Sequence, residues 1–307
     1  MIEKLDSIQI HFDTEALWLV NITLAIIMLG VALDITISDF KSLFKNPKKV
    51  LIGILLQFIL VPATTLALIY VLKPQASLAL GLMMVAACPG GNVSNFMTKL
   101  AKGNTALSVS LTAFATAMAL FATPINLAIW ASMYQPTAEI LKEVNLNPIE
   151  VAKIVLLILG IPLLVGMYIR RKFPNFAGKL SKILKPVSLL ILIAFIVVAF
   201  YNNLDIFNNY IHHAFYLVFL LNTILYFVGF YTAKLSKMSF EDQKTLSIET
   251  GIQNSGLGLM LVFLFFKGLG GMALVVAFWG IWDIFSGLVL AYYWSRKTPS
   301  KEVKIDL

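Results

Sequence analysis

Long stretches without a charged residue constrain this chain more than any other feature. Residues 50–72 and 105–134 contain no Asp, Glu, Lys or Arg. A helix needs about 20 apolar residues to cross the hydrocarbon core of a bilayer, and both stretches reach that length. Charged residues make up only 13% of the chain, against about 25% in an average soluble domain. The sequence therefore predicts an all-α polytopic membrane protein and excludes a soluble domain.

Nine apolar runs are predicted to be membrane spans. They cover residues 16–36, 50–72, 76–101, 104–132, 148–169, 186–202, 212–233, 241–266 and 271–294. Of the 24 Lys and Arg residues, all but Lys4, Lys73, Lys142, Lys153 and Lys267 then fall on one side of the membrane. Because cytoplasmic loops are enriched in Lys and Arg, we expect that side to be cytoplasmic. The N-terminus is then outside and the C-terminus inside a plasma (inner) membrane.

The remaining composition excludes several classes of protein. The net charge of +8 does not indicate nucleic-acid binding, because the basic residues cluster beside apolar runs, where topology accounts for them. The single cysteine, Cys88, cannot form an internal disulfide, and three histidines are too few for a convincing metal site. The polar, acidic N-terminus lacks the features of a signal peptide. We expect the partners to be the lipid bilayer and a small solute, with no obligate protein partner.

Two of the nine runs are poor continuous helices. The third contains Pro89, Gly90 and Gly91 in its middle, and the eighth contains Gly251 and Gly256 among polar residues. Proline removes a backbone donor, and glycine lowers helix propensity. Inside a bilayer the freed backbone groups must find partners or line a cavity. We therefore expect both spans to be broken helices.

The positions of the two breaks indicate an internal repeat. If spans 1–4 form one half and spans 6–9 the other, with span 5 as a connector, the halves cross the membrane in opposite directions. The broken span is then the third of each half, which is the best sequence indication of a transporter binding site. The alternative is two independently kinked helices whose glycines permit close packing. We expect an inverted-topology repeat with two crossing broken helices, working by alternating access.

Glu249 lies within an apolar span, where a charge at the bilayer centre costs roughly 2.5–3.5 kcal/mol. No basic residue lies in a span core to pair with it, so a bound cation would offset this cost. Neutral oxygens are available on Gln57, Ser94, Asn95, Ser108 and Thr112. Such ligands suit sodium better than zinc or copper, which prefer nitrogen or sulfur. For Ser108 and Thr112 the alternative is a hydroxyl that bonds to a carbonyl of its own helix.

These residues carry a resemblance to a known family. The stretches CPGGNVSNFMTKLAKGNTALSVSLT (88–112), LSIETGIQNSGLGL (246–259) and GILLQFILVPATT (53–65) resemble the bile acid/sodium symporter family and its bacterial homologues. The similarity extends from about Trp18 to Trp294. It implies sodium-coupled symport of an organic anion, bile acid-like or another small carboxylate. It also implies a core domain of spans 2–4 and 7–9 and a panel of spans 1, 5 and 6.

The resemblance further implies two sodium ions and one anion site. One sodium site would use Ser94, Asn95, Ser108, Thr112 and Glu249. The second would use Gln57, Glu249, Gln253 and backbone carbonyls near Thr250 and Ile252. The anion would lie between core and panel, where Asn254 matches a substrate-side asparagine and Asn92 occupies a position that varies between threonine and asparagine. The expected division is an extracytoplasmic segment over 1–15, a first half over 16–147, panel spans over 148–211, core spans over 212–295 and a cytoplasmic tail over 296–307.

Asp283 departs from the family pattern. It stands in the ninth span, where bacterial relatives often have a neutral polar residue or histidine. A second acid there should repel an anionic substrate unless it is protonated or paired. Three interpretations stay open: an acid that stabilises the fold through hydrogen bonds, a proton or cation site tied to transport, and a substrate-binding contact to a polar or cationic group.

Other functional classes remain as alternatives. A membrane enzyme needs a nucleophile–base pair or a metal, and no His or Cys lies beside Glu249 in such a motif, so we expect no enzyme. A channel would also have a polar lining, but paired broken helices favour alternating access. A transporter-derived receptor that binds a ligand without moving it is the third alternative.

Overall fold

The computed structural model describes residues 4–7, 22, 25–26, 28–30, 32–43, 46–144, 156–201 and 204–297. Over these residues the regular structure is helical, apart from one isolated antiparallel bridge between Gly90 and Gln253. The shorter helices are α1 (Lys4–Ser7), α3 (Ile37–Leu43), α4 (Pro47–Leu55), α5 (Val61–Leu72), α6 (Ala76–Ala87), α7 (Asn92–Leu100), α9 (Gln135–Glu143), α11 (Ile161–Lys172), α14 (Phe240–Gly251) and α15 (Ser255–Phe266). The longer helices are α8 (Thr105–Ser132), α12 (Pro174–Tyr201), α13 (Leu204–Leu235) and α16 (Gly270–Lys297).

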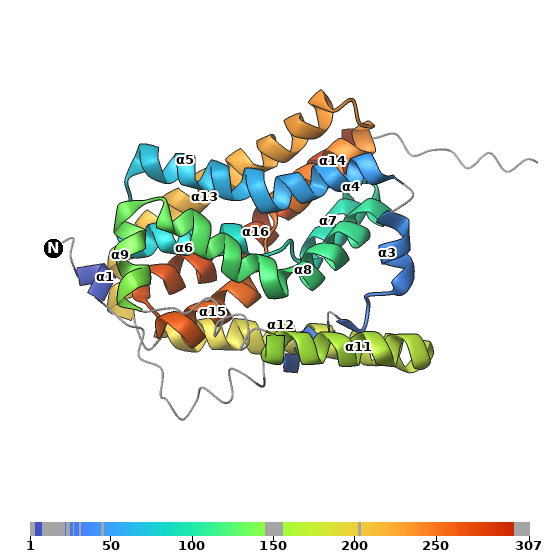
Figure 1. The fold of residues 1–307 in the computed structure, drawn as a ribbon, viewed down its shortest axis with the longest axis horizontal. Coiled ribbons are helices and arrows are strands. Elements are labelled where there is room, and N and C mark those ends of the chain that lie inside the picture. Colours follow the sequence, from blue (N-terminus) through green and yellow to red (C-terminus); the bar gives the residue numbers. More distant parts are fainter. Residues whose placement is uncertain are drawn as a thin grey trace, which may run out of the picture.

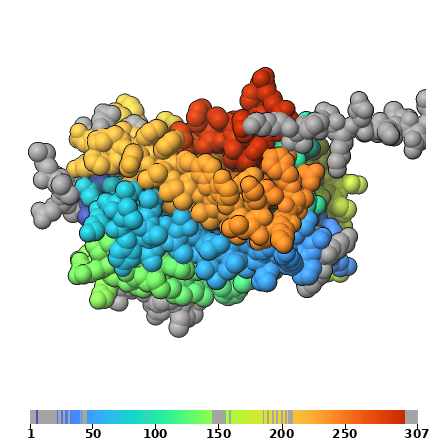
Figure 2. All heavy atoms as spheres, turned by 90° about the horizontal axis from the view of Figure 1, so that it is seen from above, coloured from blue at the N-terminus to red at the C-terminus, as the bar shows by residue number. Residues whose placement is uncertain are grey.

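The helices are arranged in layers. In Figure 1, α11 and α12 run together along the lower edge of the molecule, while α4, α5 and α13 lie along the opposite edge. Figure 2 shows α13 beside α4 and α5 on that upper face, so that helices far apart in the sequence share one surface. The largest buried apolar cluster gathers residues of α6, α15 and α16 between these layers.

Within the residues that the structure describes, four helical segments are long and apolar enough to cross a membrane. They are Pro47–Leu72, Thr105–Ser132, Asn209–Leu235 and Gly270–Arg296. These segments correspond to the predicted spans at 50–72, 104–132, 212–233 and 271–294. The predicted spans at 16–36 and 148–169 lie partly outside the described residues, so the count of nine stays a prediction.

Both expected breaks are present. The third predicted span consists of α6, which ends at Ala87, and α7, which begins at Asn92. The eighth consists of α14, which ends at Gly251, and α15, which begins at Ser255. In each case a few non-helical residues replace the helix. The first break contains Pro89, Gly90 and Gly91, which disfavour helical hydrogen bonds, whereas the second consists of Ile252, Gln253 and Asn254, directly after Gly251.

The helix that contains the sixth predicted span begins well before residue 186. Helix α12 already begins at Pro174 and continues through Pro186. Proline is favoured in the first turn of a helix, where its missing N–H has no intrahelical partner. The first turns of α12 also carry Lys179 and Lys182, so the apolar run alone underestimates the length of the helix.

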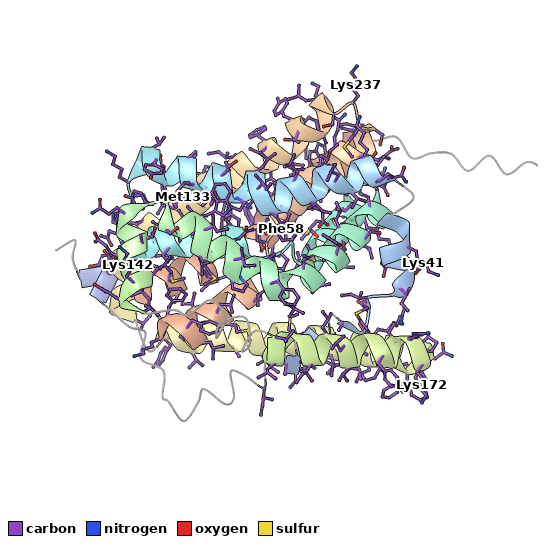
Figure 3. All side chains as sticks on the ribbon, viewed as in Figure 1. Lys41, Phe58, Met133, Lys142, Lys172 and Lys237 are labelled. Carbon is purple, nitrogen blue, oxygen red and sulfur yellow. The ribbon has the colours of Figure 1, made fainter. Side chains whose placement is uncertain are left out.

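Lysine residues lie at both ends of the helix bundle. Figure 3 shows Lys41, Lys172 and Lys237 at one end and Lys142 at the other. We call the end with Lys41, Lys172 and Lys237 the basic end. This separation agrees with the uneven distribution of Lys and Arg between the predicted loops.

A π-helical turn, η2 (Leu56–Leu60), lies between α4 and α5 and was not predicted. Its cause is Pro62, which has no N–H and whose ring clashes with the carbonyl four residues earlier. That carbonyl belongs to Phe58, and it accepts a hydrogen bond of 3.2 Å from Nδ2 of Asn126 on α8. A second π turn, η3 (Leu156–Gly160), likewise precedes a proline, Pro162. Such turns are frequent at functional sites, and η2 carries Gln57.

Candidate cation site at the crossing of two broken helices

The two breaks meet and hydrogen-bond to each other through their backbones. The amide of Asn254 donates to the carbonyl of Pro89 at 2.8 Å, and the amide of Gly91 donates to the carbonyl of Ile252 at 3.4 Å. Segments more than 150 residues apart in the chain thus satisfy the polar groups that each break exposes. This pairing meets the requirement that backbone freed inside a membrane finds partners within the protein.

Two side-chain amides each hydrogen-bond to one of the two breaks. Nε2 of Gln57 donates to the carbonyl of Cys88 at 2.9 Å, where α6 ends. Nδ2 of Asn222 on α13 donates to the carbonyl of Gly251 at 2.8 Å, where α14 ends. Each amide satisfies an orphan carbonyl at a helix C-terminus. Asn222 was not among the predicted site residues, although a single amide in an apolar span was the signal that could have found it.

Glu249 is 6% exposed and lies among side chains from three helices. Its Oε1 accepts hydrogen bonds from Ser94 Oγ on α7, at 2.5 Å, and from Ser108 Oγ on α8. Its Oε2 accepts from Thr112 Oγ1 at 3.0 Å. Asn95 Oδ1 lies 2.8 Å from Ser108 Oγ and 3.2 Å from Thr112 Oγ1. The five residues expected in one site are therefore in contact, and both α8 hydroxyls reach the acid on a neighbouring helix.

The residues expected in the second site also lie together. Gln57 Nε2 donates to Gln253 Oε1 at 2.9 Å, and Gln253 Nε2 donates to the carbonyl of Thr250 at 2.9 Å. The carbonyl of Ile252 faces Gly91 across the crossing. Each of these two carbonyls has a second lone pair that remains available to a cation.

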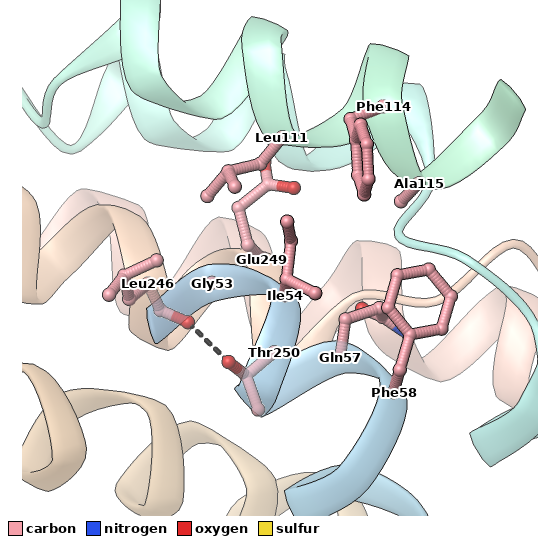
Figure 4. A pocket seen from close by; sticks show the side chains of 10 residues that line it. All are labelled: Gly53, Ile54, Gln57, Phe58, Leu111, Phe114, Ala115, Leu246, Glu249 and Thr250. Carbon is pink, nitrogen blue, oxygen red and sulfur yellow. Dashed lines mark hydrogen bonds between the residues drawn. The ribbon is translucent and has the colours of Figure 1, made fainter. Parts of the chain in front are cut away.

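A small cavity adjoins both groups of residues. Its volume is about 20 Å³, and Gln57, Glu249 and Thr250 form its polar wall. Leu111 and Phe114 of α8 close the opposite side, as Figure 4 shows. A cavity of this size holds roughly one water-sized particle. It is therefore large enough for a single dehydrated ion beside the acid.

The residues expected to face the substrate lie around the same crossing. Asn254 caps α15, because its Oδ1 accepts a 3.0 Å hydrogen bond from the amide of Leu257. Asn92 is the first residue of α7, and its side chain lies outside the described part of the chain. Asp283 on α16 is 3% exposed, and its carboxylate accepts a hydrogen bond from the amide of Gln253.

The chemistry of this site suits a hard cation. The side chains that hydrogen-bond to the Glu249 carboxylate in the described residues do so through hydroxyl oxygens, and the amide oxygen of Asn95 lies next to two of them; such ligands favour sodium over soft metals. Within the described residues, no group of three or more His, Cys, Asp or Glu gathers to hold a metal. A monovalent cation would balance the charge of the Glu249 carboxylate.

Known proteins are similar in sequence to this chain over most of its length. Residues 21–209 match the model of the Sodium Bile acid symporter family. The chain is 35% identical over 283 residues to the "Uncharacterized sodium-dependent transporter YocS" of Bacillus subtilis (strain 168), covering 92% of this chain and 85% of that protein. It is 30% identical over 243 residues to the "Probable sodium/metabolite cotransporter BASS2, chloroplastic" of Oryza sativa subsp. japonica, covering 79% and 56%.

A rabbit protein extends the similarity to animals. The "Ileal sodium/bile acid cotransporter" of Oryctolagus cuniculus is 26% identical over 253 residues, covering 80% of this chain and 70% of that protein. The chain therefore spans most of the bacterial and rabbit relatives and little more than half of the rice relative.

Proposed function

Because the chain belongs to the Sodium Bile acid symporter family, we propose that it is a secondary active transporter that couples sodium entry to the uptake of a small organic anion. The observation that carries the proposal is the buried carboxylate of Glu249, surrounded by neutral oxygens where two broken helices cross. A charge buried in a membrane protein is a functional site by default. Sodium would neutralise it, and the sodium gradient would supply the driving force.

Two sodium ions would bind on either side of this acid. The first would use the hydroxyls of Ser94, Ser108 and Thr112, with Asn95 beside them. The second would lie next to the cavity beside Gln57 and would use Gln57, Glu249, Gln253 and the carbonyls of Thr250 and Ile252; of these residues, Gln57, Glu249 and Thr250 line the cavity. The hydroxyls that now donate to Glu249 would turn their lone pairs to the ion.

The organic anion, bile acid-like or another small carboxylate, would bind beside the crossing near Asn92 and Asn254. Both α7 and α15 begin there, and a helix N-terminus carries roughly half a positive elementary charge.

We further propose nine spans in two inverted halves, with the core (spans 2–4 and 7–9) moving against the panel (spans 1, 5 and 6). The basic end would face the cytoplasm and the N-terminus would lie outside the plasma (inner) membrane.

Flux of radiolabelled organic acids into proteoliposomes, with and without an inward sodium gradient, tests the proposed function. We expect uptake against a concentration gradient only when sodium is higher outside. Downhill flux that does not respond to the sodium gradient would indicate a channel. Saturable ligand binding without any flux would indicate a receptor.

Removing the α8 hydroxyls should weaken sodium coupling without abolishing it. In Ser108→Ala and Thr112→Val, each change deletes one oxygen among several. We expect the half-saturating sodium concentration for uptake to rise about threefold to tenfold per change, which corresponds to roughly 0.7–1.4 kcal/mol. Thr65→Val is the matched control, because the Thr65 hydroxyl bonds to the carbonyl of Val61 on its own helix. An unchanged sodium dependence in the double variant would make both hydroxyls structural.

Asp283 has a different role in this proposal, as an acceptor that holds the crossing. Its hydrogen bond to the Gln253 amide needs an oxygen and no charge, which asparagine also provides. We expect Asp283→Asn to keep the sodium affinity, the substrate preference and the pH dependence of wild-type uptake. Uptake measured from pH 5 to 9 checks this: a flattened profile would favour the proton or cation interpretation. A changed order of preferred substrates would favour direct contact with the substrate.

A further inference from the structure

Helix α14 carries, toward the basic end of the bundle, a lysine that the proposed transport site does not use. Lys244 is fully buried, and it is the only buried lysine or arginine among the side chains that the structure describes. Lysine is almost never fully buried unless it is paired. A rule that places lysines at the cytoplasmic ends of spans explains where Lys244 occurs in the sequence, but it does not explain this burial.

The ammonium group of Lys244 closes the end of another helix. Its Nζ donates to the carbonyl of Ala101 at 2.7 Å and to the carbonyl of Lys102 at 2.6 Å. These carbonyls follow directly on α7, whose C-cap is Ala101. The last carbonyls of a helix have no intrahelical partner and carry partial negative charge, so a cation stabilises them. The ring of Phe240 lies 5.2 Å from the same Nζ and covers it.

Neighbouring residues of α14 hold the rest of the turn between α7 and α8. The Thr245 hydroxyl accepts a 2.8 Å hydrogen bond from the amide of Asn104, which is the N-cap of α8. The Asp242 carboxylate accepts one of 2.8 Å from Nδ2 of Asn104 and forms a 2.5 Å salt bridge with Lys49 of α4. We call Asp242, Lys244 and Thr245, with the turn over residues 101–104, the basic-end clamp.

The clamp joins the same three helices that surround Glu249. Helix α7 carries Ser94, α8 carries Ser108, and α14 carries the acid itself. At 1.5 Å per residue, Lys244 lies about 8 Å from Glu249 along α14, and Ser108 lies about 6 Å from Asn104 along α8. Helices held together within two turns of the site have little freedom to change their spacing at the site.

We propose that Lys244 is a positioning residue for the cation site: by fixing the end of α7 against α14, it sets the distance between the α7 oxygens and Glu249. This inference rests on the proposed sodium coupling. Residues that hydrogen-bond to metal ligands and hold them in place typically account for 10- to 100-fold in metal affinity. Lys244 would act in the same way, through the end of α7. A residue with a purely structural role would instead lower stability and leave the affinity of the folded protein unchanged.

The test compares Lys244→Met with Lys99→Met in the full chain. Lys99 is an exposed lysine in the last turn of α7, so its loss removes the same charge from the same helix end without opening the clamp. Two measurements are needed: the sodium concentration that half-saturates thermal stabilisation, and the one that half-saturates uptake in proteoliposomes. We expect both to rise about tenfold or more in Lys244→Met and to stay at the wild-type value in Lys99→Met.

Two further variants separate the charge of Lys244 from its volume and probe a second part of the clamp. Lys244→Arg keeps a charged donor and should lie closer to wild type than Lys244→Met does; an equally large defect would show that a cationic donor is not what positions α7 and would overturn the proposal. Thr245→Val removes a single acceptor from the clamp and carries the test if Lys244→Met does not fold. It should raise the half-saturating sodium concentration severalfold.

The positioning role is refuted if folded Lys244→Met binds sodium with wild-type affinity, even when its stability without sodium is lower. If Lys244→Met does not fold, wild-type sodium affinity in Thr245→Val refutes the role instead. A wild-type protein that shows no sodium effect at all would instead refute the proposed sodium coupling. The two failures are therefore distinct.

Discussion

Replacing Glu249 with glutamine is expected to abolish sodium-dependent uptake while the protein still folds. The glutamine side chain has the same shape and keeps an acceptor for the hydroxyls of Ser94 and Ser108, so the helices around it can stay in place. It removes the one full negative charge that both proposed sodium sites share. Deleting one partner of a buried charge pair costs roughly 3–5 kcal/mol, which is more than about 100-fold in affinity.

Thermal unfolding in a sodium titration measures this loss directly, because a ligand stabilises the folded state in proportion to its occupancy. Potassium at equal ionic strength serves as the reference salt. The control is Glu139→Gln, which removes the same charge from an exposed position on α9 and should behave as wild type. If Glu249→Gln kept the full stabilisation by sodium, the shared acid would have no part in ion binding.

A methyl group at Gly229 is expected to reduce sodium-coupled uptake roughly 10- to 100-fold. Gly229 lies on α13 where this helix contacts α14. An added Cβ would come within 2.5 Å of the Leu246 carbonyl oxygen and 2.8 Å of Ser247 Cα. These are backbone atoms that no side-chain rotation can move aside, so α14 itself must shift. Because α14 carries Glu249 and Thr250, the shift would displace ligands of both proposed sites.

Overpacking of this kind also costs stability, typically about 1–3 kcal/mol. Gly229→Ala should therefore lower the unfolding temperature as well as the sodium affinity. Gly178→Ala is the matched control on α12, since an added Cβ there meets only Arg170 Nη1, at 3.6 Å. Equal uptake by the two variants would show that the contact between α13 and α14 tolerates adjustment without loss of the site.

Features with a local physical cause could be predicted from the sequence. Pro89 with Gly90 and Gly91, and the cluster of polar residues and glycines around Gly251, lower helix propensity in the middle of apolar runs, so both breaks could be predicted. Glu249 was identified because a charge in an apolar span has a large energetic cost. Ser108 and Thr112 lie four residues apart and had to share a helix face, although the sequence alone could not tell whether they faced the acid or bonded to their own helix.

Features that depend on contacts between distant segments could not be predicted. The π turn shifts the register of the helix at Gln57, and it forms where Asn126 of α8 is available to bond to the carbonyl that Pro62 leaves free. Lys244 stands near the start of the eighth predicted span, where a lysine at the cytoplasmic end is ordinary. Its burial depends on a turn 143 residues away in the chain that folds over it, and nothing near Lys244 in the sequence specifies that contact.

The bridge between Gly90 and Gln253 has a consequence for how such a protein can evolve. Its two hydrogen bonds run between main-chain atoms, from the amides of Gly91 and Asn254 to carbonyls on the opposite segment. Any residue with a backbone N–H can supply those amides, and only proline cannot. If the solute binds beside this crossing as proposed, substitutions of Gly91 or Asn254 by residues other than proline leave donors for these two hydrogen bonds in place. Solute preference can then change by single substitutions while the two segments stay joined through their backbones.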